Sequence, residues 1–169
     1  MALIIKHGKV ATDPWLRLEL AADGSIPTAP PSSDVIVPLA MWREQRVHLL
    51  VRPGRLGVWL DSHEDPAAIA GDLGLFGVVA VNFPKLTDGR GYTTGKLLRE
   101  RYGYKGELRA VGVVARDLLQ QMERCGFDSF LLREGEDAQA ALAAFGDFSE
   151  AYQANAVQPV PLFRRRSGN

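Results

Sequence analysis

The hydrophobic positions of the chain fall into short apolar runs, separated by polar segments in which apolar residues recur with helical spacing. The runs begin near residues 35, 56, 77, 107 and 129. They are rich in Val, Leu and Ala, as expected for parallel strands that are covered on both faces. The last four starts are 21, 30 and 22 residues apart, which is the length of a repeated strand–helix unit. The pattern therefore predicts an α/β fold of four to five strand–helix units with a mainly parallel sheet.

Glycine and proline mark where the intervening helices begin and end. Pro38 can occupy the first turn of a helix that stops at 52–54. Further helices are predicted over 67–73, over 94–102 and over 113–124, and the last two are closed by Gly103 and Gly126. A final helix is expected over 137–152.

The first 33 residues have a different pattern. Apolar positions at 3–5 and at Val10 flank a turn at Gly8, and residues 15–20 alternate apolar and polar side chains. This predicts a small N-terminal β element followed by a loop. We therefore expect a single α/β domain over 1–152, which includes this element over 1–33, and a loose C-terminal tail over 153–169.

Two sheet shapes fit these units: an open doubly wound sheet or a partial, barrel-like sheet. Glu107, Arg109 and Val111 share one face of their strand because strand side chains alternate. A charged pair in mid-strand needs a polar lumen rather than a helix-covered core, which favours the partial barrel. The exposed edges of such a sheet favour a homodimer.

Charge and cysteine content narrow the function classes. The chain has 20 Lys and Arg against 20 Asp and Glu, so we expect no general binding to nucleic acid or to a membrane surface. No apolar run is long enough to span a membrane, and the start of the chain does not resemble a signal peptide. The single cysteine, Cys125, fits a cytoplasmic protein and is expected to be buried at a helix end, where the pKa of its thiol is raised.

In parallel α/β proteins, ligands bind beyond the carboxyl ends of the strands. That rule selects 61–64, 82–92, Gly112 and 133–134, and the second of these segments is the most unusual. It interleaves charged side chains with glycines and precedes a helix, where free amides favour an anion. The alternative is a turn in which Asp88 folds back on its own backbone. The candidate ligand-binding residues are Lys85, Asp88, Arg90, Tyr92, Thr94 and Arg109, which we expect to converge on one rim.

Other chemistry is less well supported by motifs. The sequence lacks phosphate-binding, dinucleotide-binding and zinc-protease motifs, and its three histidines have no metal-ligand spacing. We therefore expect no cofactor and no metal. If the protein is an enzyme, Asp88 or His63 is the candidate acid–base group and Lys85 the candidate electrophile. Arg109 either pairs with Glu107 or Asp88 or faces a ligand.

Several segments together resemble a bacterial family of unknown function whose members are often labelled "oxidoreductase probably involved in sulfite reduction". The matching segments are Asn82–Lys85, Asp88–Tyr92, Leu97–Arg101, Gly106–Gly112, Arg116–Asp117 and Arg124–Phe130. The resemblance implies an accessory role in assimilatory sulfite reduction, with sulfite reductase as a partner and a small oxyanion as a ligand. The alternatives are a small-molecule enzyme of unknown reaction and an interaction scaffold without catalysis.

Overall fold

The sheet follows the order of the chain for most of its width. The computed structural model describes residues 2–29 and 32–145. Its eight strands are ordered β2-β1-β8-β7-β6-β5-β4-β3. From β3 to β8 every neighbouring pair is parallel: β3 (Leu16–Arg17), β4 (Val35–Pro38), β5 (Leu56–Leu60), β6 (Val78–Phe83), β7 (Glu107–Gly112) and β8 (Ser129–Phe130). The hairpin of β1 (Leu3–Lys6) and β2 (Lys9–Thr12) joins β8 antiparallel.

This order decides between the two predicted shapes. A doubly wound sheet reverses its strand order at a switch point, whereas here each strand from β3 to β8 lies beside the next in sequence. The sheet curls into a half barrel, so the predicted α/β fold with a mainly parallel sheet and an N-terminal β element is confirmed, and the doubly wound alternative is wrong.

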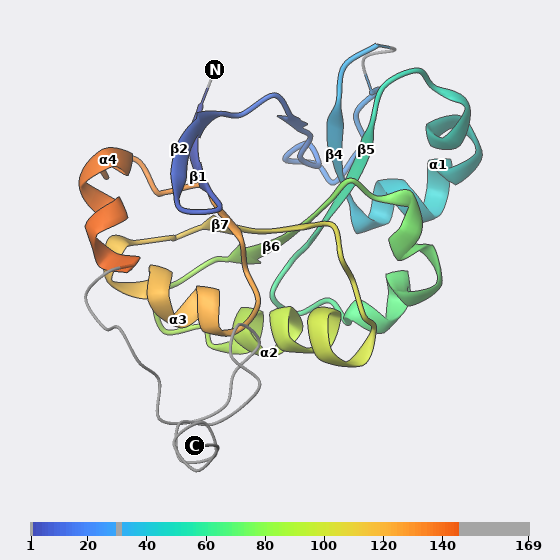
Figure 1. Cartoon of the computed structure of the whole chain (residues 1–169). Coiled ribbons are helices and arrows are strands. Elements are labelled where there is room, and N and C mark those ends of the chain that lie inside the picture. Colours follow the sequence, from blue (N-terminus) through green and yellow to red (C-terminus); the bar gives the residue numbers. More distant parts are fainter. Residues whose placement is uncertain (1, 30–31, 146–169) are drawn as a thin grey trace.

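The helical segments lie along one face of the sheet, which we call the outer face. Figure 1 shows α1, α2 and α3 in an arc from the right through the bottom to the left of the strands. The segments are α1 (Leu39–Val51), η1 (Pro66–Leu75), α2 (Arg90–Lys96), η2 (Leu97–Arg101), η3 (Arg116–Leu118), α3 (Leu119–Arg124), α4 (Ala138–Ala141) and η4 (Leu142–Phe145). Within the described residues, no helix is both long enough and apolar enough to cross a membrane.

Several predicted boundaries are shifted. The alternating segment 15–20 forms a strand only at Leu16–Arg17, and the apolar run that begins near residue 129 forms a strand of two residues, Ser129–Phe130. The helix expected from residue 113 begins only at Arg116, because the amide of Val113 donates to the carbonyl of Phe83 and continues the sheet contact. The helix expected from residue 94 begins at Arg90 and finishes as one π-helical turn. Residues 146–169, with the end of the last predicted helix and the predicted tail, lie outside the described residues.

Two apolar layers hold the sheet. On the outer face, strand residues such as Val58 and Val79 pack with Trp42 and Leu98 from the helical segments. The opposite, inner face carries a smaller cluster of five buried residues: Trp15, Ile36, Val78, Ala80 and Val111.

The indole of Trp15 packs against the inner, concave face of the half barrel. A Cβ atom at Gly77 would lie only 3.2 Å from the Trp15 ring, so glycine lets the indole approach the backbone. The Arg55 guanidinium stacks on the same ring, 4.8 Å from its centroid. Next to it, the indole of Trp59 donates to the carbonyl of Leu18 at 2.8 Å. The N-terminal segment is therefore part of the core, not an appendage to it.

Candidate functional site

Polar side chains from two successive loops meet where β5 and β6 end. We call this cluster the carboxyl-end rim and define it by Asp61, Ser62, Asn82, Asp88 and Arg90. Because β5 and β6 are neighbouring parallel strands, their loops leave the sheet at the same edge. The rim is thus positioned by two neighbouring parallel strands in the middle of the sheet.

Arg90 connects the two loops of the rim. Its Nε and Nη2 atoms donate to both oxygens of Asp88 at 2.9 and 2.6 Å, and Nη2 also donates to Ser62 Oγ at 2.9 Å. These hydrogen bonds hold the pKa of Asp88 far below its ordinary value and raise that of Arg90. The Arg90 side chain is nevertheless 60% exposed, and Nη1 has no partner among the described residues. One edge of a fixed guanidinium therefore faces solvent.

Asp61 organises the other half of the rim. Its Oδ1 accepts from the amide of Asn82 at 3.0 Å and from its neighbour's backbone amide, and its Oδ2 lies 3.4 Å from Nδ1 of His63. The Glu64 carboxylate accepts from the amide of Asp61. The imidazole of His63 is largely exposed, so the rim is flanked by a solvent-accessible histidine that lies beside a carboxylate.

Two glycines allow the backbone to close behind the rim. A Cβ at Gly91 would lie 2.6 Å from the ring of Phe83, and one at Gly112 would lie 2.4 Å from Oδ1 of Asn82. Gly112 also has a φ of 89°, which disfavours any side chain. At the ends of β6 and β7, the glycine backbone therefore packs directly against Phe83 and Asn82, which leaves no room for a side chain.

Three predicted site residues have other surroundings or no contacts. Lys85 is exposed, and its side chain makes no hydrogen bond or ion pair to the described residues. The ring of Tyr92 is half-buried edge-on against Phe83 at 5.2 Å, and burial raises its pKa. Thr94 is buried, and its hydroxyl donates to the carbonyl of Arg90 within its own helix. Only Asp88 and Arg90 of the predicted set contact each other through their side chains.

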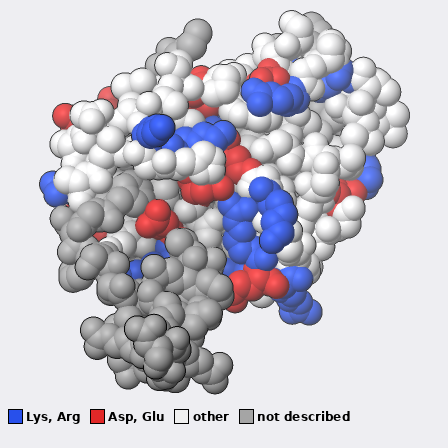
Figure 2. Space-filling model, viewed as in Figure 1, with Lys and Arg blue, Asp and Glu red and all other residues white. Residues whose placement is uncertain are grey.

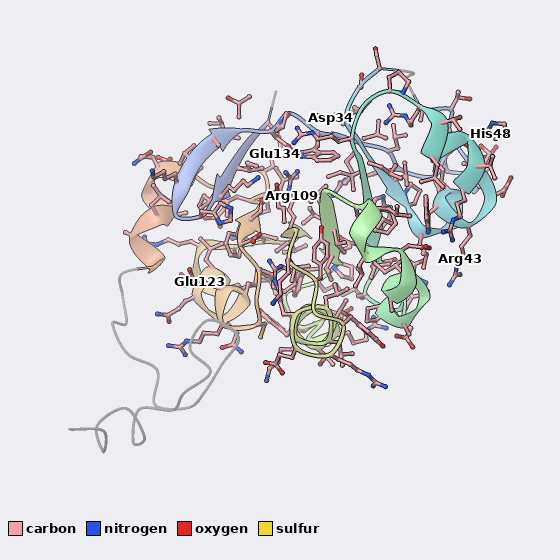
Figure 3. All side chains as sticks on the ribbon, turned by 45° about the vertical axis from the view of Figure 1, so that its right-hand side comes forward. Asp34, Arg43, His48, Arg109, Glu123 and Glu134 are labelled. Carbon is pink, nitrogen blue, oxygen red and sulfur yellow. The ribbon has the colours of Figure 1, made fainter. Side chains whose placement is uncertain are left out.

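The expected convergence of Arg109 with these residues is wrong. Arg109 donates through Nε and Nη2 to Glu107 at 2.9 and 2.7 Å and through Nη1 to Asp13 at 2.8 Å. Glu107 is two positions earlier on the same strand, so the guanidinium turns toward the amino end of β7 and away from the rim. Figure 3 shows Arg109 within the curve of the sheet, while Arg43 lies on α1 at the outside.

Arg109 instead belongs to a buried ion network. Lys6 donates to the second oxygen of Glu107 at 2.6 Å, so two cations and two carboxylates are joined. Burial by itself would raise the pKa of Glu107, but the charge of Arg109 and the hydrogen bond from Lys6 bring it below its ordinary value. The predicted pair of Glu107 and Arg109 on an inner polar face is confirmed, with Asp13 as the partner that the sequence did not indicate.

The sequence profile of a bacterial protein family of unknown function, DUF934, matches residues 57–163. The chain belongs to this family. The match begins within β5 and takes in every residue of the carboxyl-end rim. No curated protein and no solved structure matches the chain significantly.

The thiol of this DUF934 protein is placed as expected. Cys125 is buried at the end of α3, and burial raises its pKa. A thiol of raised pKa is a poor nucleophile at neutral pH.

Asp61, Ser62 and Asn82 are the residues of the rim that the sequence did not single out as ligand-binding. All three lie in the segments selected by the strand-end rule. Their side chains gave no further signal, because an aspartate, serine or asparagine next to a loop more often satisfies local backbone groups.

Proposed function

We propose that this DUF934 protein is an accessory protein of assimilatory sulfite reduction that binds a small oxyanion at the carboxyl-end rim. The observation that carries the proposal is the geometry of Arg90. Asp88 and Ser62 fix its guanidinium, and the Nη1 edge remains open to solvent. A pre-oriented planar donor is well suited to an oxyanion, because little side-chain freedom is lost on binding.

Nearby groups support the same ligand class. His63 is exposed beside Asp61, and Lys85 extends from the same loop as Asp88 without a partner in the described chain. The carboxylates of Asp61, Glu64 and Asp88 oppose the positive charges of Arg90 and Lys85, so the anion is expected to be weakly held and exchangeable. Figure 2 shows basic and acidic side chains interspersed on the visible face.

The test is isothermal titration of the protein with sulfite, sulfate and phosphate. We expect saturable binding of at least one oxyanion, which Arg90→Gln abolishes. Arg43→Gln makes the same charge change at an exposed arginine on α1 and should leave binding unchanged. Because Arg90→Gln also releases Asp88, the Lys85→Gln variant provides a second arm that leaves the rim hydrogen bonds intact. Equal binding of the oxyanions by the wild type and by all three variants would refute the anion site.

The link to sulfite reduction needs its own measurement. Sulfite reductase activity in a bacterial extract that lacks this protein should rise on addition of the wild-type protein and not on addition of Arg90→Gln. If Arg90→Gln raises the reductase activity as much as the wild-type protein does, the role in sulfite reduction does not depend on the anion site. No change with either protein would contradict the accessory role.

One contact favours a second candidate, a small-molecule enzyme. Asp61 lies 3.4 Å from Nδ1 of His63, which leaves Nε2 available as a general base. The low pKa of Asp88 makes that carboxylate a poor proton carrier at neutral pH. If the protein turns over a substrate, His63→Gln should remove activity and Asp88→Asn should affect it less.

A further inference from the structure

The second half of α1 turns most of its apolar side chains outward. Gln45 has non-helical backbone angles, so the helix is kinked before its last turns. Of the four apolar side chains that follow the kink, only Leu49 is buried. Leu50 is exposed, and Val47 and Val51 are 73% and 78% exposed. A helix that covers a sheet normally turns its apolar stripe toward the sheet, so this outward stripe is available to another molecule.

The exposed stripe of α1 continues onto a second segment. Leu75, at the end of η1, is exposed and lines a cleft of about 250 Å³ together with Leu50 and Gly54. We call Val47, Leu50, Val51 and Leu75 the α1 patch. Four of the eight large apolar side chains that are exposed in the described chain belong to it. The cleft is smaller than a typical small-molecule site, so we expect it to accept one side chain of a partner rather than a whole ligand.

The α1 patch lies at the opposite end of the sheet from the carboxyl-end rim. Its cleft is lined by residues that directly precede β5 and β6, whereas the rim follows the ends of these strands. Figure 1 shows α1 at the right-hand side of the molecule, across the sheet from the hairpin of β1 and β2. The patch is therefore separate from the proposed oxyanion site.

An ordered arginine, Arg46, lies next to Val47 in the patch. It donates through Nη1 and Nη2 to the two oxygens of Asp72 at 3.0 and 2.7 Å, and its guanidinium stacks 5.0 Å from the centroid of the Trp42 ring. The indole of Trp42 donates to the same carboxylate at 3.1 Å. The Arg46 side chain is 49% exposed and that of Asp72 only 15%. The carboxylate is thus recessed, and the surface presents the cation.

Arg55 has the same arrangement at the cleft. Its Nε and Nη2 atoms donate to Oδ2 of Asp34 at 2.9 and 2.7 Å, and its guanidinium stacks on the ring of Trp15. Again the cation is the more exposed partner, at 62% against 23%. Nε of Arg46 and Nη1 of Arg55 have no hydrogen-bond partner among the described residues. Two oriented guanidiniums therefore flank the patch, and each loses little side-chain freedom when it binds a carboxylate.

We propose that the α1 patch binds an acidic amphipathic segment of another protein, with one apolar side chain in the cleft and with Asp or Glu side chains on Arg46 and Arg55. Charge complementarity decides the kind of partner, because the cations protrude and their own carboxylates are recessed. An apolar anchor beside Arg and Trp is typical of interface hot spots.

Other occupants of the patch fit less well. A two-fold pairing of the patch with itself would place the same arginines on both sides of one interface, where like charges repel. A bilayer surface is broad and would leave the cleft between Leu50 and Leu75 unfilled. The proposal does not depend on the role in sulfite reduction or on the anion site.

A library of random twelve-residue peptides displayed on phage supplies the probe. The library is selected against the immobilised chain of 169 residues, and clones that also bind the double variant Val47→Ser/Leu75→Ser are discarded. We expect the remaining clones to combine Asp or Glu with large apolar residues. A synthetic peptide of the leading clone should bind the protein saturably in solution, and its affinity should fall as salt concentration rises.

Single variants then test the two parts of the surface with that peptide. Leu75→Ser and Arg46→Gln should each weaken binding by about tenfold or more. Leu86→Ser removes a similarly exposed leucine after β6, and Arg133→Gln removes a similarly exposed arginine that is paired with Glu136. Both controls should bind the peptide as the wild type does, and circular dichroism checks the fold of every variant.

Three results would overturn the proposal: no clone specific to the wild-type protein, specific clones without acidic residues, or equal binding of the peptide by Leu75→Ser, Arg46→Gln and the wild type. Vesicles of phosphatidylserine and phosphatidylcholine form a separate arm. Vesicle binding that both patch variants abolish, with no acidic peptide selected, would assign the patch to a membrane instead.

Discussion

Arg109 Nη1 lies 2.8 Å from Oδ2 of Asp13, although the two residues are 96 positions apart in the chain. Their side chains are only 1% and 9% exposed. Asp13 also accepts from the backbone amide of Trp15. One carboxylate therefore fixes both the guanidinium of β7 and the start of the segment that fills the half barrel.

The first prediction concerns this network. Arg109→Met should lower the free energy of unfolding by about 3–5 kcal/mol, because it leaves Asp13 and Glu107 buried without their main cation. Urea denaturation followed by tryptophan fluorescence measures the change. Arg43→Met, at an exposed helix position, should change stability by no more than about 0.5 kcal/mol. Equal midpoints for both variants would show that the buried network contributes no net stability.

The second prediction tests the backbone behind the carboxyl-end rim. Gly112→Ala should destabilise the fold by about 1–3 kcal/mol or more, because φ is positive and the added Cβ would lie 2.4 Å from Asn82 Oδ1. At Gly74, a Cβ would meet nothing within 4 Å, and φ is not in the strained region. Gly74→Ala should therefore change the unfolding free energy by less than about 1 kcal/mol. Thermal melts of the two variants give the comparison.

The third prediction is a pH dependence at Asp88. Its folded pKa is lowered by hydrogen bonds from Arg90, so the stabilisation is present above the unfolded pKa of about 4 and is lost as pH falls toward the folded value. Asp88→Asn should lower the melting temperature near neutral pH, and the difference from wild type should shrink below about pH 4.

Asp117→Asn serves as the control for that pH series, since Asp117 is an exposed carboxylate without a side-chain partner in the described chain. Its melting curve should follow the wild type across the range. A wild-type advantage over Asp88→Asn that grows toward low pH would contradict the assigned ion pair.

The fourth prediction concerns thiol chemistry. Cys125 is 5% exposed, and burial raises its pKa, so alkylation in the native protein should be at least tenfold slower than in urea. The chain has one cysteine, so the signal of a thiol reagent reports this residue alone. Native reaction as fast as in urea would mean that the end of α3 opens readily.

The local pattern of apolar residues and glycines is sufficient to predict most of the secondary-structure elements. Strands β4 to β7 and the breaks at Gly103 and Gly126 were predictable, because apolar runs and glycines at positive φ are properties of short stretches of chain. The alternation of side chains also placed Glu107 and Arg109 on one face. The helix predicted from residue 113 begins only at Arg116, in η3, because the amide of Val113 donates to the carbonyl of Phe83 on another strand.

The sequence by itself determined the α/β class, the parallel strands and the placement of Asp88 and Arg90 in one segment after β6. Tertiary structure decided which distant groups complete each cluster: Ser62 for Arg90, Asp61 for Asn82 and Asp13 for Arg109. The physical reason is that the alternation of side chains along a strand fixes the face of the sheet on which a side chain lies. It does not fix the direction along the strand in which a long side chain extends. For Arg109 that direction was set by the two carboxylates at the amino end of the sheet, because a buried guanidinium lies where its charge and hydrogen bonds are satisfied.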